Sequence, residues 1–408
     1  MFYKETEFQD SSIGKVPRDW DIRELGDEYI AEIIAGQSPP SSTYNKENHG
    51  LAFLQGKTEF GDMFPSPTVY CSKPIKLAEK DDVLLSVRAP VGDVNIAPFE
   101  CCIGRGLAAI RTRKERLSHM FLFHYLRHEG RRFQALSTGS TFKAIRMREI
   151  ESFQVPLPPT VEQTAIVGVL GVVDSAIELA DKVIAKTERL KKGLMQQLLT
   201  RGIGHTEYKD TPIGKIPKEW DVRELSDETT ADIIAGQSPS SSTYNKEYVG
   251  LPFLQGKMEF GEMFPSPTTY CSKPIKVAKK NDVLLSVRAP VGDVNIAPFE
   301  CCIGRGLAAI RTKADKLDHL FLFYYLQHEG GRFDALSTGS TFKAIRIREI
   351  AKFSIPRPSL PEQQEIVEIL SSVDKKIELE RKEKEKLEKI KLSLMDLLLT
   401  GKVRIKVD

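Results

Sequence analysis

The sequence has no run of about 20 apolar residues, so we expect no membrane-spanning helix. Its N-terminus, MFYKETEFQD, lacks an apolar signal region, which disfavours export. Six cysteines in 408 residues are few, and they fit a reduced, cytoplasmic setting better than a disulfide framework. Positive and negative charges nearly balance, 59 against 56, and this small excess permits nucleic-acid binding without arguing for it.

Catalytic signatures are also missing. No Asn-Pro or Pro-Asp dipeptide occurs, which argues against amino-methyltransferase and common nuclease motifs, and no G-x-S-x-G elbow occurs. The segment 50–58 resembles a P-loop, but its glycine spacing is one residue too long and Met258 replaces the hydroxyl in the second copy. The segment 104–109 resembles a dinucleotide turn but is not followed by a helical pattern. We therefore expect a non-enzymatic chain that binds no cofactor.

Metal ligands are equally scarce. His124 and His128 stand four apart on an expected helix, which is a spacing that metals use, but Tyr324 replaces His124 in the second copy. Surface or packing histidines are the better interpretation. Cys101 and Cys102 do not form a CxxC pair, so we expect small buried residues and no metal site.

The chain is one unit written twice at an offset of 200 residues. Residues 82–112 are identical to 282–312, and 135–146 are identical to 335–346. Two units of this length are too few and too long for a solenoid array. Each is better described as a globular domain with an appended element, and two such units can be related by a pseudo-two-fold axis.

Within each unit the pattern changes once. Residues 82–89 and 106–112 predict strands, 36–42 a loop and 120–136 a helix, before proline-rich connectors at 155–159 and 355–361. Apolar residues then alternate at steps of four and three, which is typical of a coiled coil. Roughly 38 residues of helix make a rod of about 57 Å. Glu162 and Glu362 near the helix starts suit the helix dipole, and Gly202 and Gly401 mark the stops.

These patterns predict an α+β fold with two similar globular domains and two long helices that form an antiparallel coiled coil with pseudo-two-fold symmetry. The expected segments are a first domain at 1–158, a spacer helix at 159–202, a second domain at 203–358, a second helix at 359–401 and a tail at 402–408.

Cationic and hydroxyl side chains indicate where a nucleic acid would bind. The window 100–150 holds 11 Lys and Arg against 4 Asp and Glu, while 300–350 holds 8 against 6. Hydroxyls, bare glycine amides and cations approach phosphate closely, and Gln, Asn and Arg read base edges. The candidates are Gln37, Ser38, Tyr44, Asn45, Lys46, Lys57, Arg88, Arg105, Ser140, Thr141 and Lys143 with their repeats Gln237, Ser238, Tyr244, Asn245, Lys246, Lys257, Arg288, Arg305, Ser340, Thr341 and Lys343.

Structural roles compete with this interpretation. Turn chemistry and strand-end packing explain any single one of these residues equally well, and the excess of positive charge also suits a solvated helix face. A coiled-coil scaffold with two protein-binding heads and no DNA contact is the alternative function.

The layout resembles the DNA-specificity subunit of type I restriction–modification systems over essentially the whole chain. The most specific tract is STGSTFKAIRMREIESFQVPLPPTVEQTAIVGVL followed by a long helix, and the second copy begins STGSTFKAIRIREI. The openings IGKVPRDWDIREL and IGKIPKEWDVREL are also similar to that family. The resemblance implies two target-recognition domains on double-stranded DNA, helices that set the gap between half-sites, and no catalysis by this chain.

The resemblance also implies partners. Methyltransferase subunits, two of them, would bring S-adenosylmethionine, and restriction subunits would add translocation and cleavage that use ATP and Mg. In one respect the chain departs from the family, whose members usually carry two dissimilar domains. Near-identical domains predict a near-palindromic target, diverging only if the differing residues touch bases. Those differences include Asn48-His49 against Tyr248-Val249, Thr58 against Met258 and Arg131 against Gly331.

Overall fold

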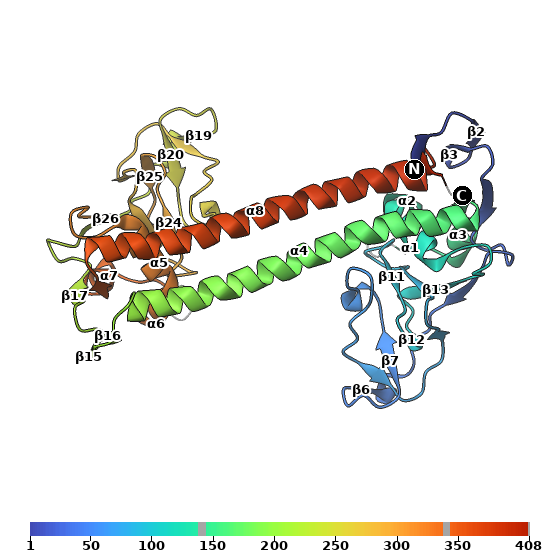
Figure 1. Ribbon diagram of the computed structural model, residues 1–408, viewed down its shortest axis with the longest axis horizontal. Coiled ribbons are helices and arrows are strands. Elements are labelled where there is room, and N and C mark those ends of the chain that lie inside the picture. The colour runs from blue at the N-terminus through green and yellow to red at the C-terminus, as the bar shows by residue number, and fades with distance from the viewer. Residues whose placement is uncertain (138–143, 338–342, 407–408) are drawn as a thin grey trace. The chain divides into compact units, whose positions relative to one another are not determined.

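The computed structural model describes residues 1–137, 144–337 and 343–406. It divides into two compact units, of which unit 1 is Met1–Asp181 with Lys382–Asp408 and unit 2 is Lys182–Arg381. Each unit therefore holds a globular head and about half of each long helix. We call the globular parts head 1, residues 1–159, and head 2, residues 202–359 (Figure 1).

Head 1 consists of short strands and three short α helices. Its strands are β1 (Phe2–Lys4), β2 (Phe8–Ser11), β3 (Gly14–Pro17), β4 (Asp21–Glu24), β5 (Ala31–Ala35), β6 (Tyr44–Asn45), β7 (Leu51–Leu54), β8 (Tyr70–Cys71), β9 (Leu77–Ala78), β10 (Val83–Ser86), β11 (Val94–Ile96), β12 (Cys101–Ile103), β13 (Leu107–Thr112) and β14 (Gln154–Leu157). Its helices are α1 (His119–His128), α2 (Gly130–Leu136) and α3 (Met147–Glu151), with 3₁₀ turns η1 (Ser41–Thr43) and η2 (Lys57–Glu59).

Head 2 repeats this order. Its strands are β15 (Tyr208–Thr211), β16 (Gly214–Pro217), β17 (Asp221–Glu224), β18 (Ala231–Ala235), β19 (Tyr244–Asn245), β20 (Leu251–Leu254), β21 (Tyr270–Cys271), β22 (Val277–Ala278), β23 (Val283–Ser286), β24 (Val294–Ile296), β25 (Cys301–Ile303), β26 (Leu307–Thr312) and β27 (Ser354–Arg357). Its helices are α5 (His319–His328), α6 (Gly330–Leu336) and α7 (Ile347–Ala351), with η3 (Ser241–Thr243) and η4 (Lys257–Glu259).

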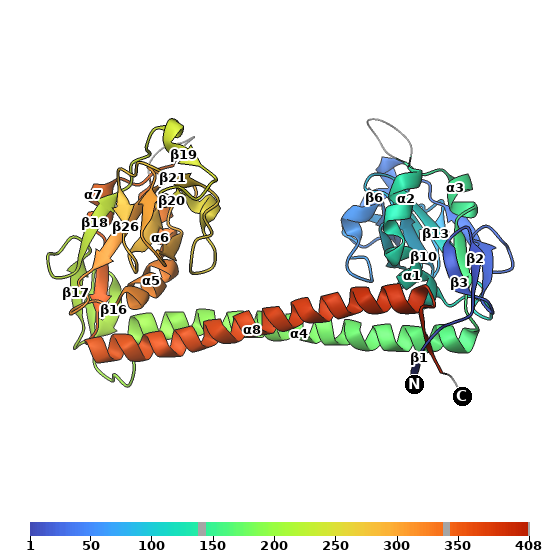
Figure 2. The same ribbon diagram turned by 90° about the horizontal axis from the view of Figure 1, so that it is seen from above.

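Two sheets form the core of each head. In head 1 the order is β11-β10-β13-β5 in one sheet and β6-β8-β7-β12-β9 in the other. Strand β10 is buried on both faces, so its side chains divide between two cores. Val83 and Leu85 pack with the aromatic residues of α1, and Leu84 packs with the second sheet. Figure 2 shows α1 and α2 beside β10 and β13. All six cysteines are buried and free, as the sequence predicts.

The helix predicted over 120–136 is in fact two helices, and that prediction was wrong in this respect. Ser118 caps α1 by accepting the Phe121 amide, α1 ends at His128, and α2 starts at Gly130 after the single residue Glu129. The break brings the Gly130 carbonyl against Gly92, where an added Cβ would lie 2.8 Å from that oxygen. Close packing of a loop on the helix junction therefore interrupts the helix.

The two long helices are α4 (Thr160–Arg201) and α8 (Leu360–Leu399). In unit 1 they run antiparallel, because Asp174 pairs with Lys391 and Asp181 with Lys384. In unit 2 the same direction follows from two pairs, Glu188 with Arg381 and Lys191 with Asp374, each 2.6 Å apart. The predicted stops are confirmed, since Gly202 and Gly401 follow the helices with φ of 66° and 70°.

The expectation that no segment could span a membrane needs correction. By length and composition alone, α4 is long and apolar enough to cross a membrane. One stretch of 18 residues has a mean hydropathy of 1.4, and 17% of that stretch is buried. The reason is that small residues such as Gly168 and Gly171 separate the apolar positions, so few charges fall in that part of the helix. Such a helix is weak evidence for a membrane.

The end of the chain forms a strand. The segment predicted as a tail contains β28 (Val403–Ile405), which pairs with β1 in an antiparallel manner. Arg404, the middle residue of β28, donates to the Glu162 carboxylate at 2.7 Å. Glu162 also accepts the Trp20 indole N–H at 3.1 Å. In unit 2 Glu362 instead accepts from Trp220 and contacts His205. Each long helix is thus tied to its head by a glutamate in its first turn.

Candidate nucleic-acid interface

A cleft of about 550 Å³ in head 2 brings together residues that lie far apart in the sequence. It is lined by loops after β18 and β20, by the end of β23 and by the turn between β25 and β26. We call it the cationic cleft, and its lining is Ser238, Pro239, Ser241, Tyr244, Gln255, Gly256, Lys257, Arg288, Ala289, Arg305 and Gly306. Five of the predicted residues of the second copy are therefore neighbours.

Glycines allow these loops to meet. A Cβ on Gly306 would lie 2.3 Å from the Gln255 carbonyl oxygen, and one on Gly236 would lie 2.1 Å from the Gly304 carbonyl oxygen. No side chain fits at either place, so only glycine lets the backbone approach this closely. The turn that carries Arg305 is thereby fixed beside the loop that carries Lys257.

Two arginines give the cleft its charge. The Arg305 amide donates to Ser238 Oγ at 3.2 Å, and Arg288 forms a β-bridge with Ala344. These backbone contacts hold both residues while their side chains stay exposed, without a carboxylate partner within the described residues. Lys257 differs, because its ammonium pairs with Asp293 at 2.8 Å. Two unneutralised guanidiniums on fixed backbone suit a phosphate or a base edge.

Head 1 repeats the same contacts. The Arg105 amide donates to Ser38 Oγ at 3.2 Å, Arg88 bridges to Ala144, and Lys57 pairs with Asp93 at 2.9 Å. The two heads therefore present the same cationic residues on the same local framework.

Several predicted residues have structural roles. The Asn45 side chain donates to the His49 carbonyl and accepts the His49 amide, so it closes a turn. Asn245 does the same with Val249. These contacts argue against the prediction that Asn45 and Asn245 read base edges, because both ends of each side-chain amide already hold the turn.

The tyrosine of this loop is also tied. Tyr44 donates its hydroxyl to the Pro39 carbonyl at 2.8 Å and packs against Phe53, and burial raises its pKa. Tyr244 makes the same bond and lines the cleft with its ring. Gln37 and Lys46 are exposed, as are their repeats Gln237 and Lys246.

Part of the predicted site cannot be placed. Ser140, Thr141, Lys143, Ser340 and Thr341 lie outside the described residues. Lys343 is described, and its ammonium pairs with Asp334 at 2.9 Å while its carbonyl accepts the Ala289 amide at 3.1 Å. Lys343, the first described residue after that gap, thus lies beside Ala289 of the cationic cleft.

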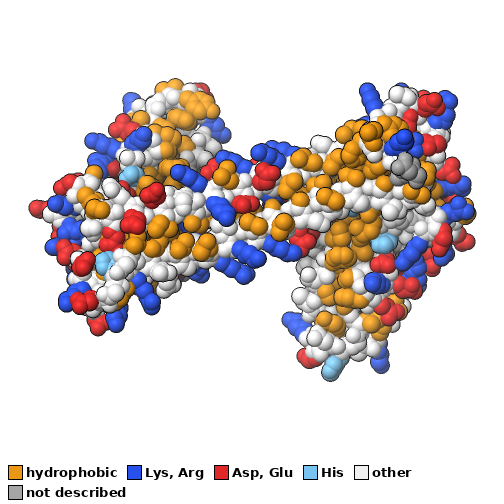
Figure 3. All heavy atoms as spheres, viewed as in Figure 1, with side chains coloured by type: hydrophobic (Ala, Val, Ile, Leu, Met, Phe, Trp, Pro, Cys, Tyr) orange, Lys and Arg blue, Asp and Glu red, His pale blue; other side chains and the backbone are white. Residues whose placement is uncertain are grey.

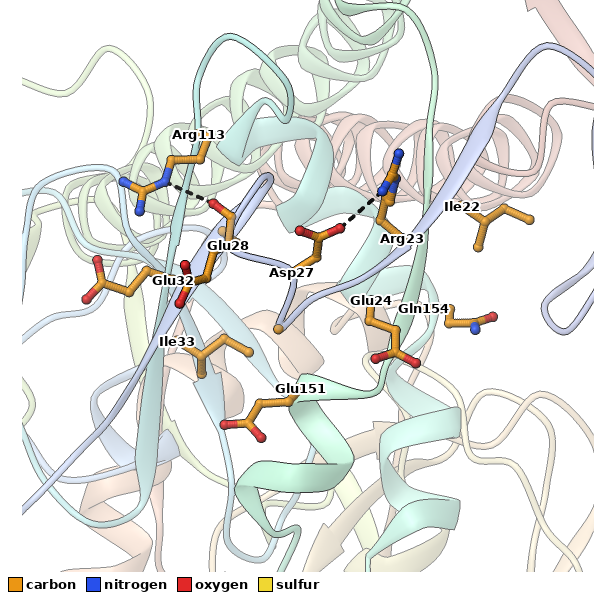
Figure 4. A pocket seen from close by; sticks show the side chains of 12 residues that line it. Ile22, Arg23, Glu24, Asp27, Glu28, Glu32, Ile33, Arg113, Glu151 and Gln154 are labelled. Atoms are coloured by element: carbon orange, nitrogen blue, oxygen red, sulfur yellow. Dashed lines mark hydrogen bonds and ion pairs between the residues drawn. The ribbon is translucent and has the colours of Figure 1, made fainter.

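A larger cavity in head 1, of about 780 Å³, is acidic and unsuited to DNA. Figure 4 shows the carboxylates of Glu24, Glu28, Glu32 and Glu151 around it. Asp27 is neutralised there by Arg23, and Arg113 donates only to a carbonyl. An excess of carboxylates repels phosphate, so this cavity and the cationic cleft have opposite electrostatic preferences. No group of three His, Cys, Asp or Glu in the described residues could hold a metal ion.

Comparisons with known proteins agree on one class. A family model of the type I restriction modification DNA specificity domain matches residues 17–189 and 217–389. The putative type I restriction enzyme MjaX specificity subunit of Methanocaldococcus jannaschii is 38% identical, with 100% of this chain and 99% of that protein covered. The MjaVIII specificity subunit of the same organism is 29% identical, with 100% and 98% covered.

Solved structures give the same result. A chain from a structure on complex assembly and conformational transition of the type I R-M system is 27% identical and has a TM-score of 0.66. The likeness covers 95% of this chain and 99% of that one.

Proposed function

The chain belongs to the DNA-specificity subunits of type I restriction–modification systems, and from this premise we propose that each head reads one half of a bipartite DNA target. The observation that carries the proposal is the repetition of exposed arginines that have no carboxylate partner among the described residues. They are Arg88 and Arg105 in head 1 and Arg288 and Arg305 in head 2, on the same local framework. The chain is the non-catalytic subunit of the system, and the alternative of a scaffold without DNA contact is not favoured.

Identical reading residues make the two half-sites identical or closely related, in inverted orientation. Residues 82–112 and 282–312 have the same sequence, and they include both arginines of each head. The same side chains on the same framework select the same base edges. An asymmetric target would need the differing residues, such as Thr58 and Met258, to touch bases.

We propose that the partners are two methyltransferase subunits. These subunits supply S-adenosylmethionine and the methylation chemistry, and the complex acts in the cytoplasm. Restriction subunits add ATP- and Mg-dependent steps. Support comes from apolar side chains left exposed on the long helices: unit 1 has Val172 at 70% and Leu392 at 66%, and unit 2 has Leu379 at 66%. Figure 3 shows orange side chains between charged ones along these helices. Each unit offers such a surface, which fits one partner per unit.

Sequencing of methylated adenines in a host that carries the system tests the target. We expect methylation at one bipartite sequence whose halves are inverted copies of each other or differ at single bases. Two unrelated half-sites would refute the symmetric reading.

The same sequencing tests the spacer role of the helices. Removing one heptad from each helix, Ile177–Val183 together with Ile377–Glu383, shortens a helix pair by about 10 Å, which is about three base pairs. We expect the gap between the half-sites to shrink by that amount or methylation to stop. Methylation with an unchanged gap would discard the spacer role.

A further inference from the structure

Head 1 contains a basic cavity whose lining includes Lys57, one of its predicted DNA-binding residues. It measures about 370 Å³ and lies between the junction of α1 with α2, the η2 turn and the start of β11. We call it the helix-end cleft, and its charged lining consists of Lys57, Asp62, Asp93, Arg127 and Arg131, with His128 beside them.

The two arginines of this cleft are not neutralised. Arg127 donates from Nη1 to the Asp62 carbonyl at 2.9 Å and lies 5.8 Å from the Phe123 ring, and it has no carboxylate partner in the part of the chain that the structure describes. Arg131 is exposed and makes no hydrogen bond or ion pair within the described residues. Lys57 alone is paired, with Asp93. Two free guanidiniums at an open cavity favour an anion with several oxygens, since arginine binds phosphate in a bidentate manner.

Head 2 provides an internal comparison. At the same positions it has Gln327, Gly331 and Asp334 in place of Arg127, Arg131 and Gln134. The charged residues at these positions therefore change from three cations and two carboxylates to one cation, Lys257, and three carboxylates. Two of those carboxylates have partners outside this set, since Glu262 pairs with Arg381 and Asp334 with Lys343.

The local framework is nevertheless the same. Arg132 pairs with Glu129 at 2.8 Å in head 1, and Arg332 pairs with Glu329 at 2.7 Å in head 2. Asp334 additionally pairs with Lys343. The heads thus share this ion pair at the helix junction and differ in the charged residues around it.

The position of the cleft indicates which phosphate it would meet. Lys57 lines the helix-end cleft of head 1, and its repeat Lys257 lines the cationic cleft of head 2. Because head 1 repeats the framework of head 2, we infer that Lys57 lies between the helix-end cleft and the surface that carries Arg88 and Arg105. A duplex whose bases lie at the cationic cleft continues past it, and the groups that it offers outside the half-site are backbone phosphates.

We propose that the helix-end cleft of head 1 binds backbone phosphates next to its half-site and that head 2 lacks this site, so two related half-sites are held with unequal strength. The inference rests on the proposed function, because it takes DNA as the ligand of both heads. The residues that contact bases are the same in the two heads, and only the sequence-independent affinity for phosphates differs.

Paired exchanges between the heads test the proposal. Arg127→Gln with Arg131→Gly gives head 1 the residues of head 2, and Gln327→Arg with Gly331→Arg does the reverse. A Cβ added at Gly331 meets no heavy atom within 4 Å, so the backbone at that position accepts a side chain. The measurement is the slope of log K against log salt concentration. It uses the complex of the full chain with its methyltransferase subunits and a duplex that carries the methylated target.

We expect the head 1 exchange to make the slope shallower by about 2 and the head 2 exchange to make it steeper by a similar amount, at about 0.9 per phosphate contact. Lys80→Ala with Lys114→Ala is the matched control. It also removes two charges from head 1, but near Asp81 and His119 at the other end of α1, and it should leave the slope unchanged.

Unchanged slopes in both exchanges, or an equal change in the control, would overturn the inference. If the head 1 exchange lowers the melting temperature, the head 2 exchange decides alone. Failure of the proposed function looks different, because the wild-type complex would then bind the target and a scrambled duplex equally well.

Discussion

At position 124 on α1 the two heads differ in one buried polar group. In head 2 the Tyr324 hydroxyl donates to Asp374 Oδ2 at 2.7 Å. In head 1 both ring nitrogens of His124 and Oδ2 of Asp174 are buried without a hydrogen-bond partner among the described residues. Burial lowers the pKa of His124 to about 4, with Asp174 opposing that shift and Lys391 and Arg127 adding to it.

This histidine predicts a pH dependence of the stability of unit 1. The folded state keeps His124 neutral down to about pH 4, whereas the unfolded chain binds a proton near pH 6.5. As the pH falls between those values, the free energy of unfolding should fall by up to about 3 kcal/mol. Denaturant unfolding between pH 7.5 and pH 4.5, a range set by these pKa values, measures the change.

His124→Tyr is the matched variant, because it installs the residue of head 2. The new hydroxyl should reach Asp174 as Tyr324 reaches Asp374, raise the stability of unit 1 at neutral pH and remove this part of the pH dependence. Tyr324→His should transfer the dependence to unit 2. Identical pH profiles of the wild type and His124→Tyr would contradict the assignment.

For single residues, the sequence predicts which cations are exposed better than it predicts which side chains form hydrogen bonds within the protein. Arg88, Arg105 and Lys57 were candidates because cations in exposed turns bind phosphate, and the structure places their repeats around one cleft. Asn45 was a candidate by residue type alone, and its turn with His49 depends on a local backbone path that residue type does not specify. Arg127 was missed, although its replacement by Gln327, one of three differences between α1 and α5, was a signal in the sequence.

Among the elements, the pairing of β1 with β28 closes unit 1 through Arg404. This side chain is 11% exposed and pairs with Glu5, Asp19 and Glu162. Its removal would leave the buried carboxylate of Glu162 without its cation, and loss of one partner of a buried pair costs about 3–5 kcal/mol.

Arg404→Ala should therefore lower the free energy of unfolding of unit 1 by that amount, as read from denaturant or thermal unfolding. Lys402→Ala is the control, because Lys402 pairs with Asp396 at the surface and both side chains are about half exposed. Surface pairs contribute about 0–1 kcal/mol, so this variant should unfold nearly as the wild type does. Equal effects of the two variants would show that the cluster does not hold the strands together.

The elements differ in how far the sequence predicts them. The helices α4 and α8 begin and end within two residues of the expected segments, because heptads, prolines and glycines are local signals. The two sheets were not foreseen, since strands such as β8 and β9 are two residues long and pair with distant segments. The same holds for β28, whose partner lies at the other end of the chain.

For the whole molecule, the modest net charge of +3 conceals two opposite surfaces. The net charge adds the positive residues of the cationic cleft to the negative residues of the acidic cavity. Composition alone therefore neither required nor excluded DNA binding. Repetition is the stronger signal at this scale, because two copies of one cationic framework predict two equivalent contacts with a duplex. The difference between the heads at the helix-end cleft then predicts that these contacts are unequal in strength.

We propose above all that each head binds one half-site through its own pair of arginines. Hydroxyl-radical footprinting of the methyltransferase complex on its methylated target tests it most directly, with three proteins: wild type, Arg88→Ala with Arg105→Ala, and Arg288→Ala with Arg305→Ala. We predict two protected half-sites for the wild type and loss of protection in one half only for each variant. Protection of both halves in both variants would contradict the account.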